Sequence, residues 1–162
     1  MPRAAVLLAL VSLVIALPAA AADAAATAKS VTIRVVVVPV TRQVKDVPPK
    51  RFNLGEKSRG DTLSGTSILR NAVAQFGKPK GARVGTSRFV EVWLTPRRLT
   101  IDSVGRLPGG TLHVHGVGSI ETNRPKLPIV GGTGVYAGAT GSVVGQVLPS
   151  GQQLDVFRLR VP

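Results

Sequence analysis

The chain has 162 residues, which suits one domain of ordinary size, and it contains no cysteine, which excludes disulfides and thiolate metal sites. Lys and Arg outnumber Asp and Glu by 21 to 8, and this excess favours anionic neighbours such as a cell-envelope polymer. Because aromatic residues that could stack on bases make up only 4% of the chain, we expect no nucleic-acid partner.

The N-terminus has the three parts of a secretory signal peptide. Arg3 precedes an apolar run over residues 4–17 and an alanine-rich stretch after Pro18. Small residues around Ala22 predict cleavage there, giving a signal peptide at 1–22, and cleavage after Ala28 is the alternative. An uncleaved anchor is disfavoured because the run is shorter than the ~20 residues that span a bilayer, and no later transmembrane segment is expected. We therefore predict a protein that is secreted or resides in the cell envelope.

A short disordered N-terminus at 23–30 and a single domain at 31–162 follow the signal. Segments rich in β-branched residues alternate there with turn residues, a pattern typical of a sandwich or a barrel. The charged, proline-containing stretch at 42–60 predicts a mobile loop. The spacing of apolar residues at 67–76 leaves a helix open as an alternative to a strand end. The expected strands are 31–41, 62–71, 83–94, 98–104, 111–118, 127–130, 139–148 and 152–161.

The first expected strand is apolar on both faces. Successive side chains of a strand point to opposite sides, so Val35 to Val38 place valines on each side of the sheet. One face would fill an interior, and the other would need a partner subunit or another layer. Pro39 cannot donate to the ladder and predicts an edge, a bulge or the strand end.

The two histidines of the chain, His113 and His115, lie two residues apart in one expected strand and therefore on one face. Such a pair can contribute to a metal site, but no further ligands follow at a suitable spacing. We expect no metal, and a hydrogen-bonded or exposed pair is the default.

The acidic residues within expected strands are Glu91, Asp102 and Asp155, and Asp61 lies just before a strand. An acid that points into the interior must be paired or have its pKa moved, which is how a general acid or base is made. The weak catalytic candidates are therefore Glu91, Asp102, His113 and His115, and the alternative is that each acid pairs with an outer arginine. No nucleophile elbow or phosphate-binding loop is present, so we expect no cofactor.

Glycines cluster around the lone tyrosine, Tyr136, in the segment IVGGTGVYAGATG. Glycine permits positive φ and close approach of another backbone, so this spacing predicts a tight structural corner rather than a nucleotide site. The corner glycines are Gly131, Gly132, Gly134, Gly138 and Gly141.

This glycine segment resembles the superfamily that unites allene oxide cyclases with dirigent proteins, whose members carry GGTG or GGSG, then an aromatic residue, then small residues before a strand. Gly60-Asp61, Val84-Gly85 and Glu121 before Leu127-Pro128-Ile129 fall in a similar order. The resemblance covers about 31–161. By matching position, only Asp61 and Tyr136 are carried over as ligand-binding candidates.

The resemblance implies an eight-stranded antiparallel β-barrel, usually trimeric, with a cavity for an apolar small molecule. Cyclases and dirigent proteins of this kind guide a reactive species by confinement. The sequence departs from them at Ala137 and Thr140, where plant dirigent proteins usually carry arginines, and in a first strand without the carboxylate of the cyclases. The expected activity, if catalytic, is a cofactor-free cyclisation or stereoselective coupling. The alternatives are a carrier of apolar ligands and a non-catalytic envelope-binding protein that uses its basic surface.

Overall fold

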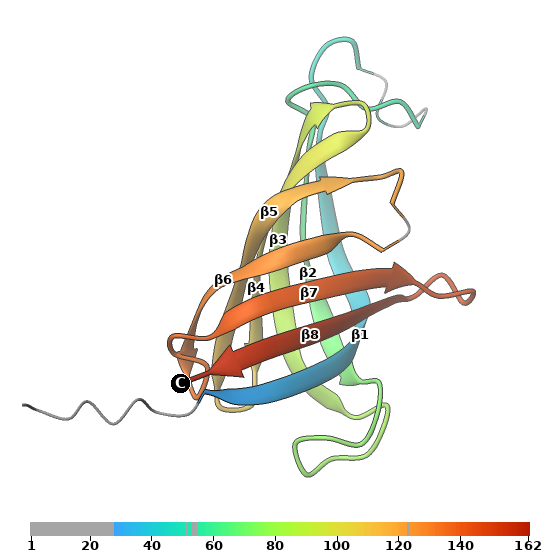
Figure 1. The fold of residues 1–162 in the computed structure, drawn as a ribbon. Helices are drawn as coiled ribbons and strands as arrows, with labels where there is room; N and C mark the ends of the chain where they lie inside the picture. Colours follow the sequence, from blue (N-terminus) through green and yellow to red (C-terminus); the bar gives the residue numbers. More distant parts are fainter. Residues whose placement is uncertain (1–27, 51, 53–54, 123) are drawn as a thin grey trace, which may run out of the picture.

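The computed structural model describes residues 28–50, 52, 55–122 and 124–162 (Figure 1). The predicted signal peptide, its cleavage site after Ala22 and the alternative one after Ala28 involve residues outside these ranges. None of the described segments forms a helix that is long and apolar enough to cross a membrane.

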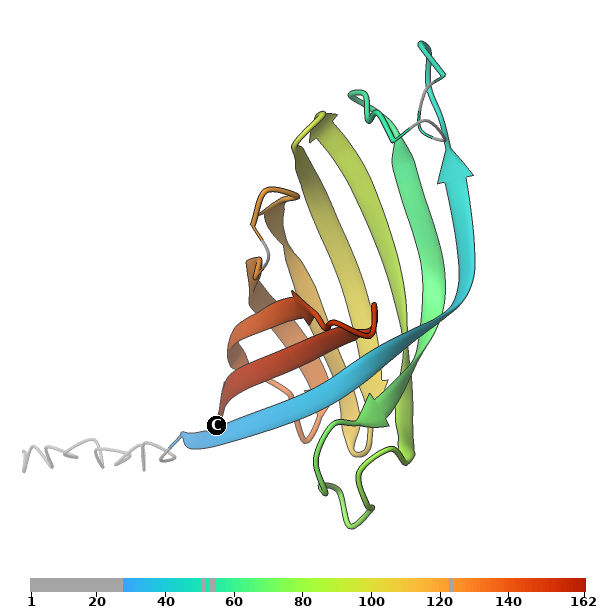
Figure 2. The same ribbon diagram turned by 90° about the vertical axis from the view of Figure 1, so that its right-hand side faces the viewer.

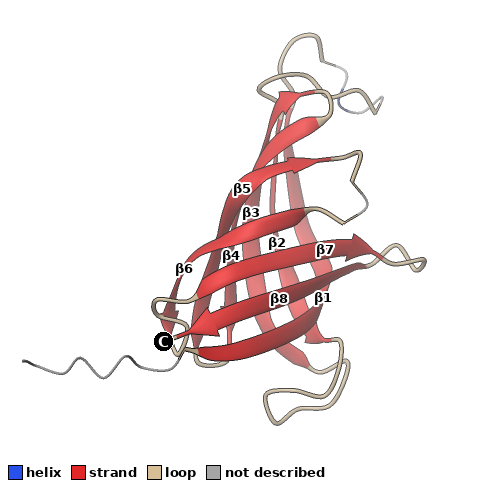
Figure 3. Cartoon of the chain, viewed as in Figure 1, coloured by secondary structure: helices blue, strands red, loops and turns tan. Residues whose placement is uncertain are grey.

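Eight antiparallel strands form a closed barrel, and the described residues contain no α-helix (Figure 3). Each strand pairs with the next, and the last pairs with the first, which confirms the predicted fold. The strands are β1 (Lys29–Lys45), β2 (Thr62–Asn71), β3 (Arg83–Thr95), β4 (Arg98–Leu107), β5 (Gly110–Ser119), β6 (Lys126–Gly134), β7 (Thr140–Val147) and β8 (Gln153–Val161).

The first strand is longer than predicted at both ends. Lys29 and Ser30, expected in a disordered N-terminus, pair with Val161 and Arg160, because the last strand offers a ladder of free hydrogen-bonding groups there. At the other end, residues 42–45 of the expected loop continue the ladder to β2. A bulge after Pro39 accommodates the proline in this extension.

The helix alternative at 67–76 is wrong. Ser67 to Asn71 belong to β2, and the chain then turns, with Phe76 at a φ of 57°. Asn71 explains the turn, since its buried side-chain amide donates to the backbone oxygens of Gln75, Lys78 and Pro79 at 2.8–3.2 Å. A local network of this kind competes successfully with helical hydrogen bonds.

The two faces of β1 are covered unequally. Val35 is fully buried inside the barrel, whereas Val36 and Val38 on the outer face are only half-buried. Among the described residues no second layer of secondary structure covers this outer face (Figure 2). The predicted partner subunit therefore stays a prediction.

Figures 1 and 2 show the end of the barrel where β1 begins and β8 ends, which we call the closed end. A cluster of buried apolar side chains fills this end. The central members of this cluster are Ile33, Val35, Leu112 and Leu159, each at most 3% exposed. A smaller cluster lies at the opposite end, which we call the mouth, and centres on Leu63, Trp93 and Leu99. The interior between the two clusters is where a cavity forms.

Candidate functional site

The barrel interior contains a cavity of about 470 Å³ on the mouth side of the closed-end core. Its position follows from side-chain size, because several positions along its wall are occupied by small residues such as Ser87, Ser103, Gly118 and Gly145. The volume lies within the range of sites that enclose small molecules.

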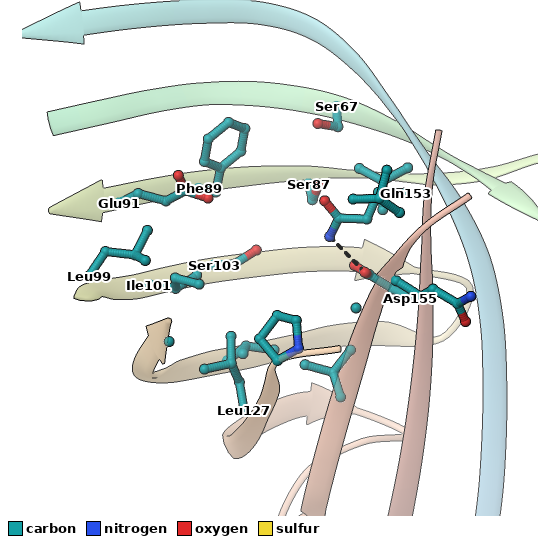
Figure 4. Close-up of a pocket in the computed structure, with 18 of the residues that line it drawn as sticks. Ser67, Ser87, Phe89, Glu91, Leu99, Ile101, Ser103, Leu127, Gln153 and Asp155 are labelled. Atoms are coloured by element: carbon teal, nitrogen blue, oxygen red, sulfur yellow. Dashed lines mark hydrogen bonds between the residues drawn. The ribbon is translucent and has the colours of Figure 1, made fainter. Parts of the chain in front are cut away.

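The wall of the cavity toward the mouth is mainly apolar. Phe89 and Trp93 of β3 lie beside Leu99 and Ile101 of β4, and all four line the cavity because alternate residues of a strand share one face. Figure 4 shows Phe89, Leu99 and Ile101. Phe52 packs edge-on against Trp93 with ring centroids 5.3 Å apart, which extends the apolar surface toward the mouth.

Polar side chains gather deeper in the cavity. Ser67 of β2 is directly opposite Ser87 of β3, and Ser103 of β4 is diagonal to Ser87. Three neighbouring strands therefore each contribute one hydroxyl group to the cavity (Figure 4). Asp155 and Gln153 of β8 face them from another part of the wall. The cavity thus has an apolar upper part and a polar lower part.

Asp155 is the carboxyl group with the most strongly shifted pKa in this cavity. Burial raises its pKa to about 6, although a hydrogen bond from Gln153 Nε2 to Asp155 Oδ1, 2.7 Å long, acts in the opposite direction. The group therefore changes its protonation state just below neutral pH. The sequence placed Asp155 among the strand acids but did not single it out, although Phe157 and Leu159 at alternate positions mark its inward face.

Glu91, a predicted catalytic candidate, also lines the cavity, nearer the mouth (Figure 4). Burial raises the pKa of Glu91, and the positive charge of Arg42 partly opposes this effect. Arg42 lies on the cavity wall in the part of β1 that was expected to be a loop. The structure thus brings Glu91 and Asp155 into one cavity on different strands.

The other three candidates lie together on the outside of the barrel. Asp102 Oδ2 is 3.1 Å from His113 Nε2 and 3.2 Å from His115 Nδ1, and all three side chains are about half exposed. The hydrogen bond with His113 is the main cause that lowers the pKa of Asp102. None of the three lines the cavity, and in the part of the chain that the structure describes no group of three or more His, Cys, Asp or Glu residues could hold a metal ion.

Asp61 anchors the loop at the mouth instead of lining the cavity. Its carboxylate accepts hydrogen bonds from the backbone amides of Val47 and Ser58 at 2.9 and 2.8 Å, and from the Ser58 hydroxyl at 3.1 Å. Burial raises the pKa of Asp61, but these hydrogen bonds outweigh it and hold the pKa below its usual value. Its role in the structure is to fix residues 47 and 58 beside the start of β2.

Tyr136 lies at the closed end, away from the cavity. Its ring is 4% exposed within the core, its hydroxyl donates to the Pro108 carbonyl at 3.0 Å, and burial raises its pKa. Gly134 and Gly141 nearby adopt positive φ, and a Cβ at either would overlap a backbone oxygen of the neighbouring strand or hairpin. The segment forms a tight corner in which Tyr136 packs as a core residue.

Fold and site together define a class: a closed antiparallel barrel, solid at one end, with a partly apolar cavity that holds two carboxyl groups of raised pKa. Comparison of the sequence with models of known families and with curated proteins gives no match. Comparison of the structure with solved structures does give matches.

Three solved structures illustrate the likeness. A pyocyanin demethylase matches with a TM-score of 0.65 and 18% identity over 80% of this chain and 99% of that one. The pterocarpan synthase dirigent protein GePTS1 matches with a TM-score of 0.63 and 14% identity, over 83% of this chain and 84% of that one. The Diels–Alderase AbmU from Streptomyces koyangensis matches with a TM-score of 0.63 and 19% identity, over 86% of this chain and 72% of that one. The chain therefore shares the fold of these solved structures, a dirigent protein among them, and its closed eight-stranded barrel is the fold that the resemblance of the glycine segment implied.

Proposed function

We propose that this barrel binds an apolar small molecule in its cavity and guides the cyclisation or coupling of that molecule. The observation that carries the proposal is a partly apolar cavity of about 470 Å³ into which two carboxyl groups with raised pKa values project. Active sites commonly combine a mostly apolar pocket with a few convergent polar groups of perturbed pKa. The matching solved structures, named as a demethylase, a pterocarpan synthase and a Diels–Alderase, support chemistry on small organic molecules.

The distribution of polar groups favours one orientation of the ligand. An apolar body packs against Phe89, Trp93 and Leu99, and an oxygen-bearing end reaches the serine hydroxyls and Asp155 below. Buried hydroxyls that face a ligand oxygen stabilise it, whereas an all-hydrocarbon ligand leaves them without that partner. The ligand class is therefore an apolar molecule with a carbonyl, hydroxyl or ether group at one end.

Confinement supplies most of the proposed effect. A reactive species held in one near-attack conformer has lost its competing geometries before it reacts, and the walls of the cavity exclude water. Asp155, which has a pKa of about 6, adds a group able to donate or accept a proton near neutral pH, and Glu91 is a second such group. This mechanism requires no cofactor.

Ligand binding is tested with the neutral apolar fluorophore N-phenyl-1-naphthylamine. Trp93 is the one tryptophan of the chain and lines the cavity, so energy transfer from it to the probe reports binding at this site. We expect Ser103→Phe, which fills the cavity, to weaken binding by about tenfold or more, equivalent to about 1.4 kcal/mol. The matched control is Val104→Phe, because residue 104 is the next residue of β4 and points outward.

Equal binding to both variants would contradict the proposed site.

Guidance of a reaction is tested separately, by measuring the enantiomeric excess of a product. One substrate carries a tethered diene and alkene, and the other is a phenol that is coupled by an added one-electron oxidant. An excess that is lost in Ser103→Phe supports guidance. Tight probe binding with racemic products throughout would instead identify a carrier of apolar ligands.

A further inference from the structure

The charged side chains of the barrel are distributed unevenly between its two ends. Acidic side chains in the described part of the chain lie in the mouth segments, in the cavity or on the middle of the outer wall. They are Asp46, Glu56 and Asp61 between β1 and β2, Glu121 after β5, Glu91 and Asp155 in the cavity, and Asp102 on the outer wall. The closed end carries none of these acids, but it carries many cations.

Exposed arginines occur on the outer wall of the closed end on five adjacent strands, β8, β1, β2, β3 and β4. All belong to outward-facing strand positions, and Figure 1 shows β8 and β1 side by side at this end of the barrel. We call this group the basic belt, and its members are Arg34, Arg70, Arg83, Arg106, Arg158 and Arg160. Lys29, Lys78 and Lys80 lie in the segments beside it.

The strand register brings the belt arginines close to one another. Arg70 of β2 is directly opposite Arg83 of β3. Arg34 is opposite Val156, while Arg158 is opposite Thr32, so Arg34 and Arg158 are diagonal neighbours. Opposite and diagonal positions of antiparallel strands are about 5 to 8 Å apart, and like charges directly opposite each other, as Arg70 and Arg83 are, destabilise the sheet. The belt therefore has an unfavourable self-energy that a bound polyanion would relieve.

Among the residues that the structure describes, no acidic side chain forms an ion pair with a belt arginine. β1, β2, β6 and β7 contain no Asp or Glu, and the acids of β3 and β8, Glu91 and Asp155, point into the cavity. The ion pairs between described residues involve Arg97 with Glu121 and the two histidines with Asp102, and none includes a belt arginine. Arg70 does donate to the Gly81 carbonyl at 3.0 Å, which leaves its positive charge in place.

The shape and composition of the belt select among polyanions. Guanidinium groups bind phosphate oxygens through paired hydrogen bonds, and a flexible linear polymer can follow a convex wall across several strands. A flat bilayer contacts only part of such a wall, and the exposed large apolar residues near this end are Val73 and Val135, not the Trp, Phe or Leu of membrane-surface anchors. Aromatic side chains for stacking bases are likewise missing from the exposed large apolar residues of the described chain.

We propose that the basic belt is a docking surface for a linear phosphate polymer, separate from the ligand cavity. The mouth lies at the opposite end of the barrel, so a protein docked through the belt keeps its cavity open to small molecules. Docking holds the protein along the polymer without occupying the site of the proposed reaction.

The test measures binding of fluorescently labelled linear polyphosphate by anisotropy over a series of salt concentrations. The belt variant is Arg34→Gln/Arg158→Gln/Arg160→Gln, and the control variant, Arg98→Gln/Arg124→Gln/Lys126→Gln, removes the same charge at the mouth. We expect the belt variant to bind about tenfold more weakly or worse, and its slope of log K against log salt to fall by about 3, one unit per lost phosphate contact. We expect the control to keep both values near those of the unaltered protein.

Equal losses in the two variants would overturn the proposal, since net charge alone would then explain binding. Tighter binding to single-stranded DNA, to poly-glutamate or to vesicles of phosphatidylglycerol and phosphatidylcholine, at matched charge, would also overturn it in favour of that partner. Both variants must retain binding of N-phenyl-1-naphthylamine, which shows that they are folded. This readout also separates failure of the belt from failure of the proposed cavity function.

Discussion

Asp155 and Asp102 show how the face of a strand decides the chemistry of a carboxyl group. Asp155 points into the cavity, where burial raises its pKa to about 6, whereas Asp102 points outward, where the hydrogen bond with His113 is the main cause that lowers its pKa. Both acids lie within strands of the same barrel. Only the first has the properties of a group that exchanges protons with a bound ligand near neutral pH.

The raised pKa of Asp155 predicts a specific pH dependence of stability. Between the unfolded value of 3.8 and the folded value of about 6 the folded state binds more protons, so stability decreases as pH rises through this window. Above about pH 6 the buried carboxylate lowers the free energy of unfolding by its full amount, about 2–3 kcal/mol for a pKa shift of this size. Asp155→Asn keeps an oxygen for Gln153 and removes the charge, so we expect it to stabilise the protein by about that amount at pH 8 and hardly at all at pH 4.

Urea unfolding of the two proteins at pH 4 and pH 8 measures this difference. A stabilisation that is the same at both pH values would contradict the assignment, because an uncharged effect of the substitution does not depend on the ionisation of Asp155. Glu91→Gln is a useful comparison, since the pKa of Glu91 is also raised by burial and its stability effect has the same sign.

The inward or outward direction of these acids could be predicted from alternation, but their depth in the barrel could not. Leu99, Ile101 and Ser103 form one face of β4, which already places Asp102 on the other. Whether an inward acid meets a cavity or a packed core depends on which residues of neighbouring strands lie at the same level. Local pattern shows neither register nor level, so it could not separate Glu91, which lines the cavity, from an acid in a packed core. Tyr136 was a candidate only through the family resemblance, and the structure places it in the closed-end core.

At the scale of elements, the corner between β6 and β7 depends on two different properties of glycine. Gly134 has a φ of 61°, and a Cβ there would overlap the Gly109 carbonyl, whereas a Cβ at Gly131 would meet nothing within 4 Å. The sequence motif treated these glycines alike. The structure separates one that the backbone requires from one that has free space beside it.

This separation gives a matched pair of substitutions. We expect Gly134→Ala to reduce the free energy of unfolding by about 2 kcal/mol or more, from the left-handed backbone conformation and the steric overlap. Gly131→Ala, three residues away in the same strand, is expected to change it by less than about 0.5 kcal/mol. Chemical unfolding monitored by Trp93 fluorescence measures both, and equal effects would contradict the role assigned to Gly134.

The strand boundaries differ from prediction where long-range pairing extends a strand beyond its local pattern. Local composition marked the charged residues 42–45 as loop, and only the partner strand β2, far along the chain, makes them part of β1. The reverse holds at 72–76, where apolar spacing suggested a helix but the hydrogen bonds of Asn71 impose a turn.

At the scale of the whole molecule, assembly into a trimer stays a prediction from the family resemblance. Val90 and Val117 on the outer wall are more than 40% exposed in the single chain, which leaves apolar surface for a partner. We expect sedimentation equilibrium to give three times the mass of one chain over a wide concentration range. A mass equal to one chain would contradict the expectation and would leave the outer face of β1 exposed to solvent.

The pairing of β1 with β8 joins the beginning of the barrel to its end. A chain that is still being synthesised cannot complete this pairing, because one edge of β1 stays unpaired until β8, more than a hundred residues away in the sequence, has been made. We therefore expect barrel closure to be a late event in folding. Such a delay would keep the newly made polypeptide unfolded for longer, and export across a membrane, which the N-terminal sequence predicts, would require that unfolded state.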